Sequence, residues 1–204
     1  MADIASQYPT SPEFSSVNFT VNTPTIATET FSGKTRRVGF GHQFYSWQAK
    51  YNTLTDAQAA IVEGFSAQTY GSLLSFEIIL PKISYSKSTN PPSTVPATTA
   101  AYSIGTKTVA VDNCGANKII LNVGDYFKFS GHSKVYQAVA TSTANGSGEA
   151  TILFAGSLVA NVGNNENVIV TAVPFTAIMS NPTQKFDVGV GGLTNITVDM
   201  RETW

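Results

Sequence analysis

The stretch NTLTDAQAAIVEGFSAQTYGSLLSF, residues 52–76, carries the clearest helix signal in the chain and decides how the neighbouring strands are organised. Thr55 and Gln58 have the spacing of a capping box, in which the hydroxyl and the amide satisfy two free backbone N–H groups. Gly71 can adopt the positive φ that commonly ends a helix. The pattern predicts one helix over residues 55–70.

An apolar stripe on this helix indicates that it lies on a sheet. Ala57, Ile61 and Phe65 are four residues apart and therefore share one face. The residues on both sides of the helix are typical of strands. FYSWQAKY, residues 44–51, alternates aromatic or small side chains with polar ones, and the apolar run SLLSFEIIL after the helix ends at Pro81. The sequence thus predicts a strand, then a helix that packs on a sheet, then a second strand.

The composition of the 204 residues narrows the classes of function. Only 12% of the residues are charged and the formal net charge is -1, so the chain lacks the basic footprint of a nucleic-acid-binding protein. A surface that is poor in charge resists self-association weakly, and we expect it to be covered by neighbouring subunits. Cys114 is the only cysteine, which excludes an intrachain disulfide and a cysteine metal cluster. The N-terminal residues do not resemble a signal peptide, and no apolar run is long enough for a membrane span, so we expect neither standard export nor membrane insertion.

The remainder of the chain is predicted to consist of strands and turns. Candidate strands at residues 17–21 and 26–31 precede a turn at SGKT, and residues 85–101 have the Pro, Ser and Thr content of a linker or exposed loop. Five short strands follow within residues 102–173. This number and size suit a small closed or partly open barrel of the OB type, with a small sandwich as the alternative. LTNITVDMRETW at the end alternates as a strand whose partner the sequence does not identify.

Residues that could carry chemistry are few and scattered. His42 and His132 are the only histidines, and neither has a second metal ligand at a usable spacing. No run resembles a calcium loop, and the glycines of GVGGL, residues 189–193, are better explained by a turn than by a phosphate site. We assign no catalytic, cofactor-binding or metal-binding residue and expect no enzyme activity. The four carboxylates considered as a calcium set are Asp112, Asp125, Glu149 and Glu166.

One group of aromatic residues allows two interpretations. Tyr126, Phe127, Phe129 and Tyr136 could form a surface on which sugar rings stack, or they could belong to the core of the predicted barrel. Strand alternation accounts for most of them as core residues. The first interpretation supports a module that binds a host-surface glycan or protein, as in a tail fibre or adhesin, and it stays open from the sequence alone.

The order of these elements resembles the distal tail and minor tail proteins, including tail-tip and baseplate hub proteins, of long-tailed phages. In that family an aromatic strand leads into a Leu-Thr helix start, a late helix Phe, a glycine turn and a strand that ends in Leu-Pro. The inserted region and the closing strand add further matching residue types. The positions that match around the helix are Trp47, Tyr51, Leu54, Thr55, Ala59, Phe65, Gly71, Phe76, Leu80 and Pro81. The later ones are Gly124, Asp125, Tyr126, Phe127, Lys134, Val135, Tyr136, Gly148, Leu158, Pro174, Phe175, Glu202 and Trp204.

The resemblance implies a fold and a role. Residues 1–84 together with 174–204 would form a β-sandwich with one packed helix, residues 85–101 a linker, and residues 102–173 an inserted OB-like domain. The protein would be a structural virion component, made in the host cytoplasm and built into the phage tail. It would form a homo-oligomeric ring, usually a hexamer, that joins the tail tube to tip or fibre proteins.

Overall fold

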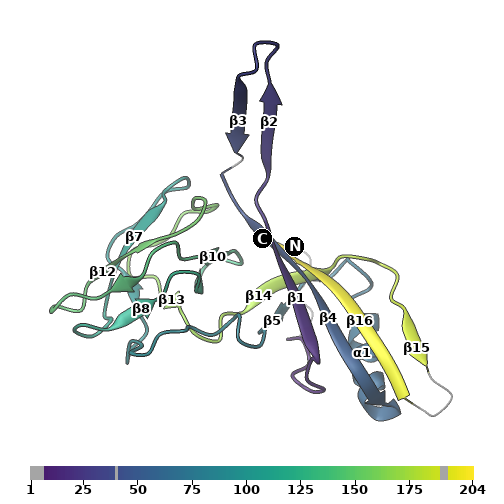
Figure 1. Cartoon of the computed structure of the whole chain (residues 1–204). Coiled ribbons are helices and arrows are strands. Elements are labelled where there is room, and N and C mark those ends of the chain that lie inside the picture. The colour runs from purple at the N-terminus through teal and green to yellow at the C-terminus, as the bar shows by residue number, and fades with distance from the viewer. Residues whose placement is uncertain (1–6, 40, 189–192) are drawn as a thin grey trace. The chain divides into compact units, whose positions relative to one another are not determined.

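The computed structural model describes residues 7–39, 41–188 and 193–204, and it shows a mainly β protein with one helix (Figure 1). Several antiparallel sheets form, and none of them closes into a barrel within the described residues. The chain divides into two compact units. Unit 1 comprises Met1–Val21, Tyr45–Leu80 and Pro174–Trp204, and unit 2 comprises Asn22–Phe44 and Pro81–Val173.

Unit 1 contains one six-stranded sheet. Its main path runs β1-β4-β16-β14-β5, and β15 pairs with the other end of β16. The strands are β1 Ser16–Asn22, β4 Phe44–Thr55, β5 Phe76–Ile78, β14 Phe175–Met179, β15 Phe186–Val188 and β16 Leu193–Glu202. All described strands of unit 1 thus belong to this one sheet, where a sandwich of two sheets was expected.

β16, the last strand of the chain, pairs with β4. Val198 lies opposite Ala49 and Met200 opposite Trp47, and all four side chains are buried. Alternate residues of β16 are exposed, so this strand has one core face and one open face. The partners that the sequence could not identify for the closing strand are therefore β4 on one side and β14 and β15 on the other.

The helix α1, Asp56–Gln68, begins with the predicted capping box. The Gln58 N–H donates to the Thr55 hydroxyl, and the Gln58 amide in turn accepts from the Thr55 N–H at 3.0 Å. The predicted apolar stripe is wrong in two of its three positions. Ala57 and Ile61 are exposed, whereas Phe65 is buried. The helix turns a neighbouring stripe toward the core, and its buried residues are Ala59, Val62, Phe65 and Ser66.

Aromatic rings fill the space between α1 and the sheet of unit 1. Phe65 packs edge-on against Tyr8, with ring centroids 4.8 Å apart, and against Phe76 at 5.2 Å. The Tyr51 hydroxyl donates a hydrogen bond of 3.1 Å to the Tyr8 hydroxyl in the same buried region. Phe65, shared by the predicted and the observed stripe, therefore anchors the helix.

The buried tyrosine pair should make unit 1 sensitive to alkali. Burial raises the pKa of Tyr51 to about 12 and that of Tyr8 well above its ordinary value. A raised pKa in the folded state stabilises the fold fully below about pH 10, where unfolded tyrosine keeps its proton, and this stabilisation is lost as the pH rises further.

Urea unfolding between pH 8 and 12 measures this effect. We expect the free energy of unfolding to fall above about pH 10, and to fall less steeply in a double variant, Tyr8→Phe/Tyr51→Phe, which removes both hydroxyls together. Tyr70→Phe is the control, because that side chain is exposed. An equally steep fall in the double variant would contradict this account.

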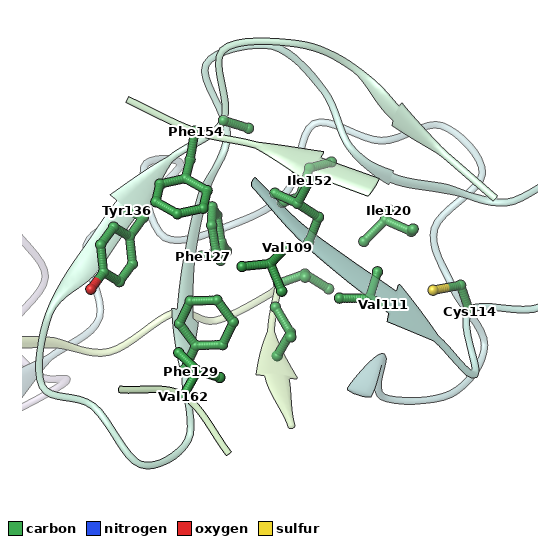
Figure 2. Close-up of a cluster of buried hydrophobic side chains, with 14 of the residues drawn as sticks. Val109, Val111, Cys114, Ile120, Phe127, Phe129, Tyr136, Ile152, Phe154 and Val162 are labelled. Carbon is green, nitrogen blue, oxygen red and sulfur yellow. The ribbon is translucent and has the colours of Figure 1, made fainter. Parts of the chain in front are cut away.

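Unit 2 consists of short strands around one core. Its sheets outside the N-terminal hairpin are β10-β9-β13, β11-β8 and β12-β7-β6. The strands are β6 Ala97–Thr98, β7 Thr108–Asp112, β8 Ile119–Leu121, β9 Tyr126–Phe129, β10 Val135–Gln137, β11 Ser142–Thr143, β12 Ala150–Leu153 and β13 Val168–Ile169. Figure 2 shows the rings of Phe127, Phe129, Tyr136 and Phe154 gathered at one end of this core, and aliphatic side chains such as Val109 and Ile152 beside them.

The closed form of the predicted OB-type barrel does not form within the described residues, because the strands are divided among three sheets that share a core. Residues 85–101, predicted as a linker or exposed loop, make hydrogen bonds within unit 2. The Ser88 hydroxyl donates to the backbone oxygen of Ile119 at 2.8 Å, and β6 pairs with β7. A Pro, Ser and Thr composition describes a segment without an apolar core of its own, but it does not prevent hydrogen bonds to the strands of the same unit.

Candidate functional site

Three of the four carboxylates considered as a calcium set hold separate loops. Asp125 accepts hydrogen bonds from the Ser86 hydroxyl at 2.8 Å and from the Asn122 N–H at 2.9 Å. Glu166 accepts from two glycine N–H groups, and Glu149 accepts from the side chain of Asn145. No three His, Cys, Asp or Glu side chains come together as metal ligands in the part of the chain that the structure describes. The hydrogen bonds of Asp125, Glu149 and Glu166 hold loops in place.

The histidines and the cysteine also lie apart from one another. His132 is buried, and its Nε2 lies 2.9 Å from the backbone oxygen of Asn161, while His42 is half-buried at the base of the N-terminal hairpin. Cys114 is buried as a free thiol, and burial together with the nearby Asp112 raises its pKa to about 11. Such a thiol is a poor nucleophile near neutral pH.

The aromatic group that could have stacked sugars belongs to the core. Tyr126, Phe127, Phe129 and Tyr136 are all buried. Phe127 packs edge-on against Phe129, with centroids 5.6 Å apart. These rings therefore offer no exposed face for a glycan. Of GVGGL only Leu193 lies within the described residues, so its predicted turn is outside them.

The most exposed element of the protein is a two-stranded hairpin near the N-terminus. It consists of β2, Thr25–Glu29, and β3, Thr35–Gly39, and every residue of both strands is exposed (Figure 1). Its turn is well defined, because the Gly33 N–H donates to the Thr30 carbonyl and the Thr30 hydroxyl donates to the Lys34 carbonyl at 3.0 Å. We call residues 25–39 the arm.

The two faces of the arm differ in chemistry. Ile26 lies opposite Val38, and Thr28 lies opposite Arg36, so these side chains share one face. Ile26 is 52% exposed and Val38 is 62% exposed. The other face carries Ala27 opposite Arg37, and Phe31 at the tip is fully exposed. One face of the arm therefore combines an apolar pair with a cation.

A polar groove of about 320 Å³ lies on the open face of the unit 1 sheet. Asp187 of β15 is paired with Asn195 of β16, which places its side chain on the same face as the exposed Asp199. Gln48 donates a hydrogen bond of 2.8 Å to Asp199 and so holds that carboxylate in position. The lining side chains are Asn181, Thr183, Gln184, Lys185, Asp187, Asn195, Thr197 and Asp199.

A second groove, of about 470 Å³, lies within unit 2 beside the proline-rich loop. Pro91, Pro92 and Val95 supply apolar surface on one side of it, and β13 supplies the other. Serine and threonine hydroxyls complete its lining, which includes no charged side chain. This groove can hold an uncharged apolar group.

Charge is distributed unevenly between the two units. By sequence, unit 1 has eight acidic and three basic residues, a formal charge of -5, and unit 2 has five acidic and nine basic residues, a formal charge of +4. The arm alone has Lys34, Arg36 and Arg37 against Glu29, a charge of +2. Three basic residues beside a turn, in a chain so poor in charge, were the sequence signal for this surface, and our sequence interpretation missed it.

Comparisons with known proteins add no assignment. The chain matches no protein-family model, and a search of curated proteins returned no match. Among the described residues, no helix has the length and apolar character needed to cross a membrane.

Proposed function

We propose that this protein is a structural subunit of a phage tail that assembles with copies of itself into a ring at the distal end of the tail tube. The observation that carries the proposal is the order of elements. β4 leads into the capped helix α1, β5 precedes Pro81, the part of unit 2 from Pro81 to Val173 follows as an insertion, and β14 and β16 return to the same sheet. This order agrees with the one that the resemblance to distal tail proteins implies.

The distribution of surface properties supports the same role. A chain with only 12% charged residues has few charges to desolvate when its surface is covered by identical copies. Among the described residues, Asp125, Glu149 and Glu166 hold separate loops and His132 and Cys114 are buried, which favours a structural over a catalytic role. In this proposal unit 1 forms the ring as a sandwich-like body, and unit 2 is an OB-like peripheral domain that meets fibre or tip proteins.

Light scattering coupled to size-exclusion chromatography, over a range of concentrations, tests the ring. We expect a mass of about six chains, and rings in negatively stained images of the same fraction. A trimer would favour a fibre protein over a ring subunit. A monomer at every concentration would contradict spontaneous ring formation.

A further inference from the structure

The geometry points to a specific contact between copies, and this inference rests on the proposed function. We infer that the arm of one copy docks on the polar groove of unit 1 in a second copy. The docking face is the one that carries Ile26, Val38 and Arg36. Arg36 would pair with the groove carboxylates Asp187 and Asp199.

The first argument is that the arm is only marginally stable without a partner. An isolated two-stranded hairpin is marginally stable in water, and a third strand or a packed face is needed to hold it. Ile26 and Val38 form a cross-strand pair, yet more than half of each side chain is exposed. In the groove, the methyl groups of Thr183 and Thr197 and the aliphatic part of Lys185 are the apolar atoms that would cover this pair and remove its surface from water.

The opposite formal charges of the arm and of unit 1 favour a second copy of the chain as that partner. The arm has a formal charge of +2, whereas unit 1 has a formal charge of -5. The groove presents two exposed carboxylates, from Asp187 and Asp199, against the single cation of Lys185. A guanidinium pairs well with carboxylates because its planar donors match their geometry. The chain therefore carries both a basic arm and an acidic groove of matching chemistry.

The proposed ring sets the symmetry of the contact. Because the arm and the groove consist of different residues, each copy can give its arm to one neighbour and receive the arm of another, which is the heterologous arrangement that a ring requires. Contacts of this kind close into rings when the rotation between copies closes, and they extend into filaments when it does not. Arm docking would thus supply the repeated contact that the proposed ring needs.

Variants of the arm test which face docks. The arm variant is Ile26→Ser/Arg36→Ser, and its matched control is Ala27→Ser/Arg37→Ser, which makes the same type of changes on the opposite face. Sedimentation velocity of the full chain at low salt measures self-association. We expect the arm variant to associate about 100-fold more weakly than the wild type, and the control to change by less than about 10-fold.

Variants of the groove test where the arm docks. The groove variant is Asp187→Lys/Asp199→Lys, and its control is Glu13→Lys/Glu63→Lys, which changes the charge of unit 1 equally at other positions. We expect only the groove variant to lose association, again by about 100-fold. A mixture of the arm variant and the groove variant should form a one-to-one dimer, because that pair retains one intact arm and one intact groove.

The outcomes separate the docking contact from the ring. A wild type that assembles, together with arm and groove variants that assemble equally well, overturns the docking and leaves the ring in place. A wild type that forms open chains sensitive to both variants supports the docking and contradicts the ring. A wild type that stays monomeric throughout contradicts both. Equal losses in the variants and their controls overturn the docking, because they show that only the net charge matters.

Discussion

Replacing Phe65 with aspartate is expected to unfold unit 1. The side chain is buried and packs against Tyr8 and Phe76, with ring centroids 4.8 and 5.2 Å away. Removing a buried phenylalanine costs about 3–5 kcal/mol, and burying a carboxylate without a partner adds to this. The total, more than about 5 kcal/mol, is comparable to the entire stability of many domains.

The measurement is urea unfolding followed by tryptophan fluorescence, to which the buried Trp47 and the partly exposed Trp204 of the same unit both contribute. Ile61→Asp is the matched control, because it makes a similar apolar-to-acid change on the same helix at a side chain that is 46% exposed. We expect the control to cost less than about 1 kcal/mol. Equal losses in the two variants would mean that the helix presents the originally predicted stripe to the core. A folded Phe65→Asp protein that still forms rings would also weaken the proposed function.

The helix α1 shows which features of the fold the sequence could predict. The capping box of Thr55 and Gln58 was predictable, because both partners lie within one helical turn and their bonds do not depend on the rest of the fold. The buried stripe was not. Apolar residues at four-residue spacing occur on two neighbouring stripes of α1, and only the sheet that packs against the helix selects between them.

Long-range pairing was equally inaccessible to sequence reasoning. The alternation of β16 predicted a strand with one buried face, which is confirmed. Its partner β4 lies far away in the sequence, and period-two patterns contain no information about register between distant strands. The arm gives the opposite case, because residues 26–31 were predicted as a strand and yet both of its faces are exposed. Alternation indicates a strand, but burial depends on what covers it.

The sequence also could not show that unit 2 does not close into a barrel. Its strand segments were predictable, because each is a short apolar run between turn residues. Barrel closure requires that the first and last strands pair, and this depends on tilt and register. Here β13 pairs with β9, and β12 pairs with β7 in a different sheet. The core was nevertheless foreseeable, since the aromatic residues favoured as core by alternation are those that are buried.

The second large effect is expected at the centre of that core. Phe127 is fully buried, and its ring lies within 5.7 Å of the ring centroids of Phe129, Tyr136 and Phe154 (Figure 2). Phe127→Ala removes the ring that the other three contact and leaves a cavity between short sheets. The expected cost is about 3–5 kcal/mol in the free energy of unfolding of unit 2.

Limited proteolysis with mass spectrometry, combined with thermal unfolding, locates the effect in the chain. We expect new cleavages of Phe127→Ala within Pro81–Val173, together with a lower unfolding temperature. Phe31→Ala is the control, because it deletes the same ring at the fully exposed tip of the arm and should leave the unfolding temperature unchanged. If Phe127→Ala resisted protease as the wild type does, these rings would not be holding the sheets together.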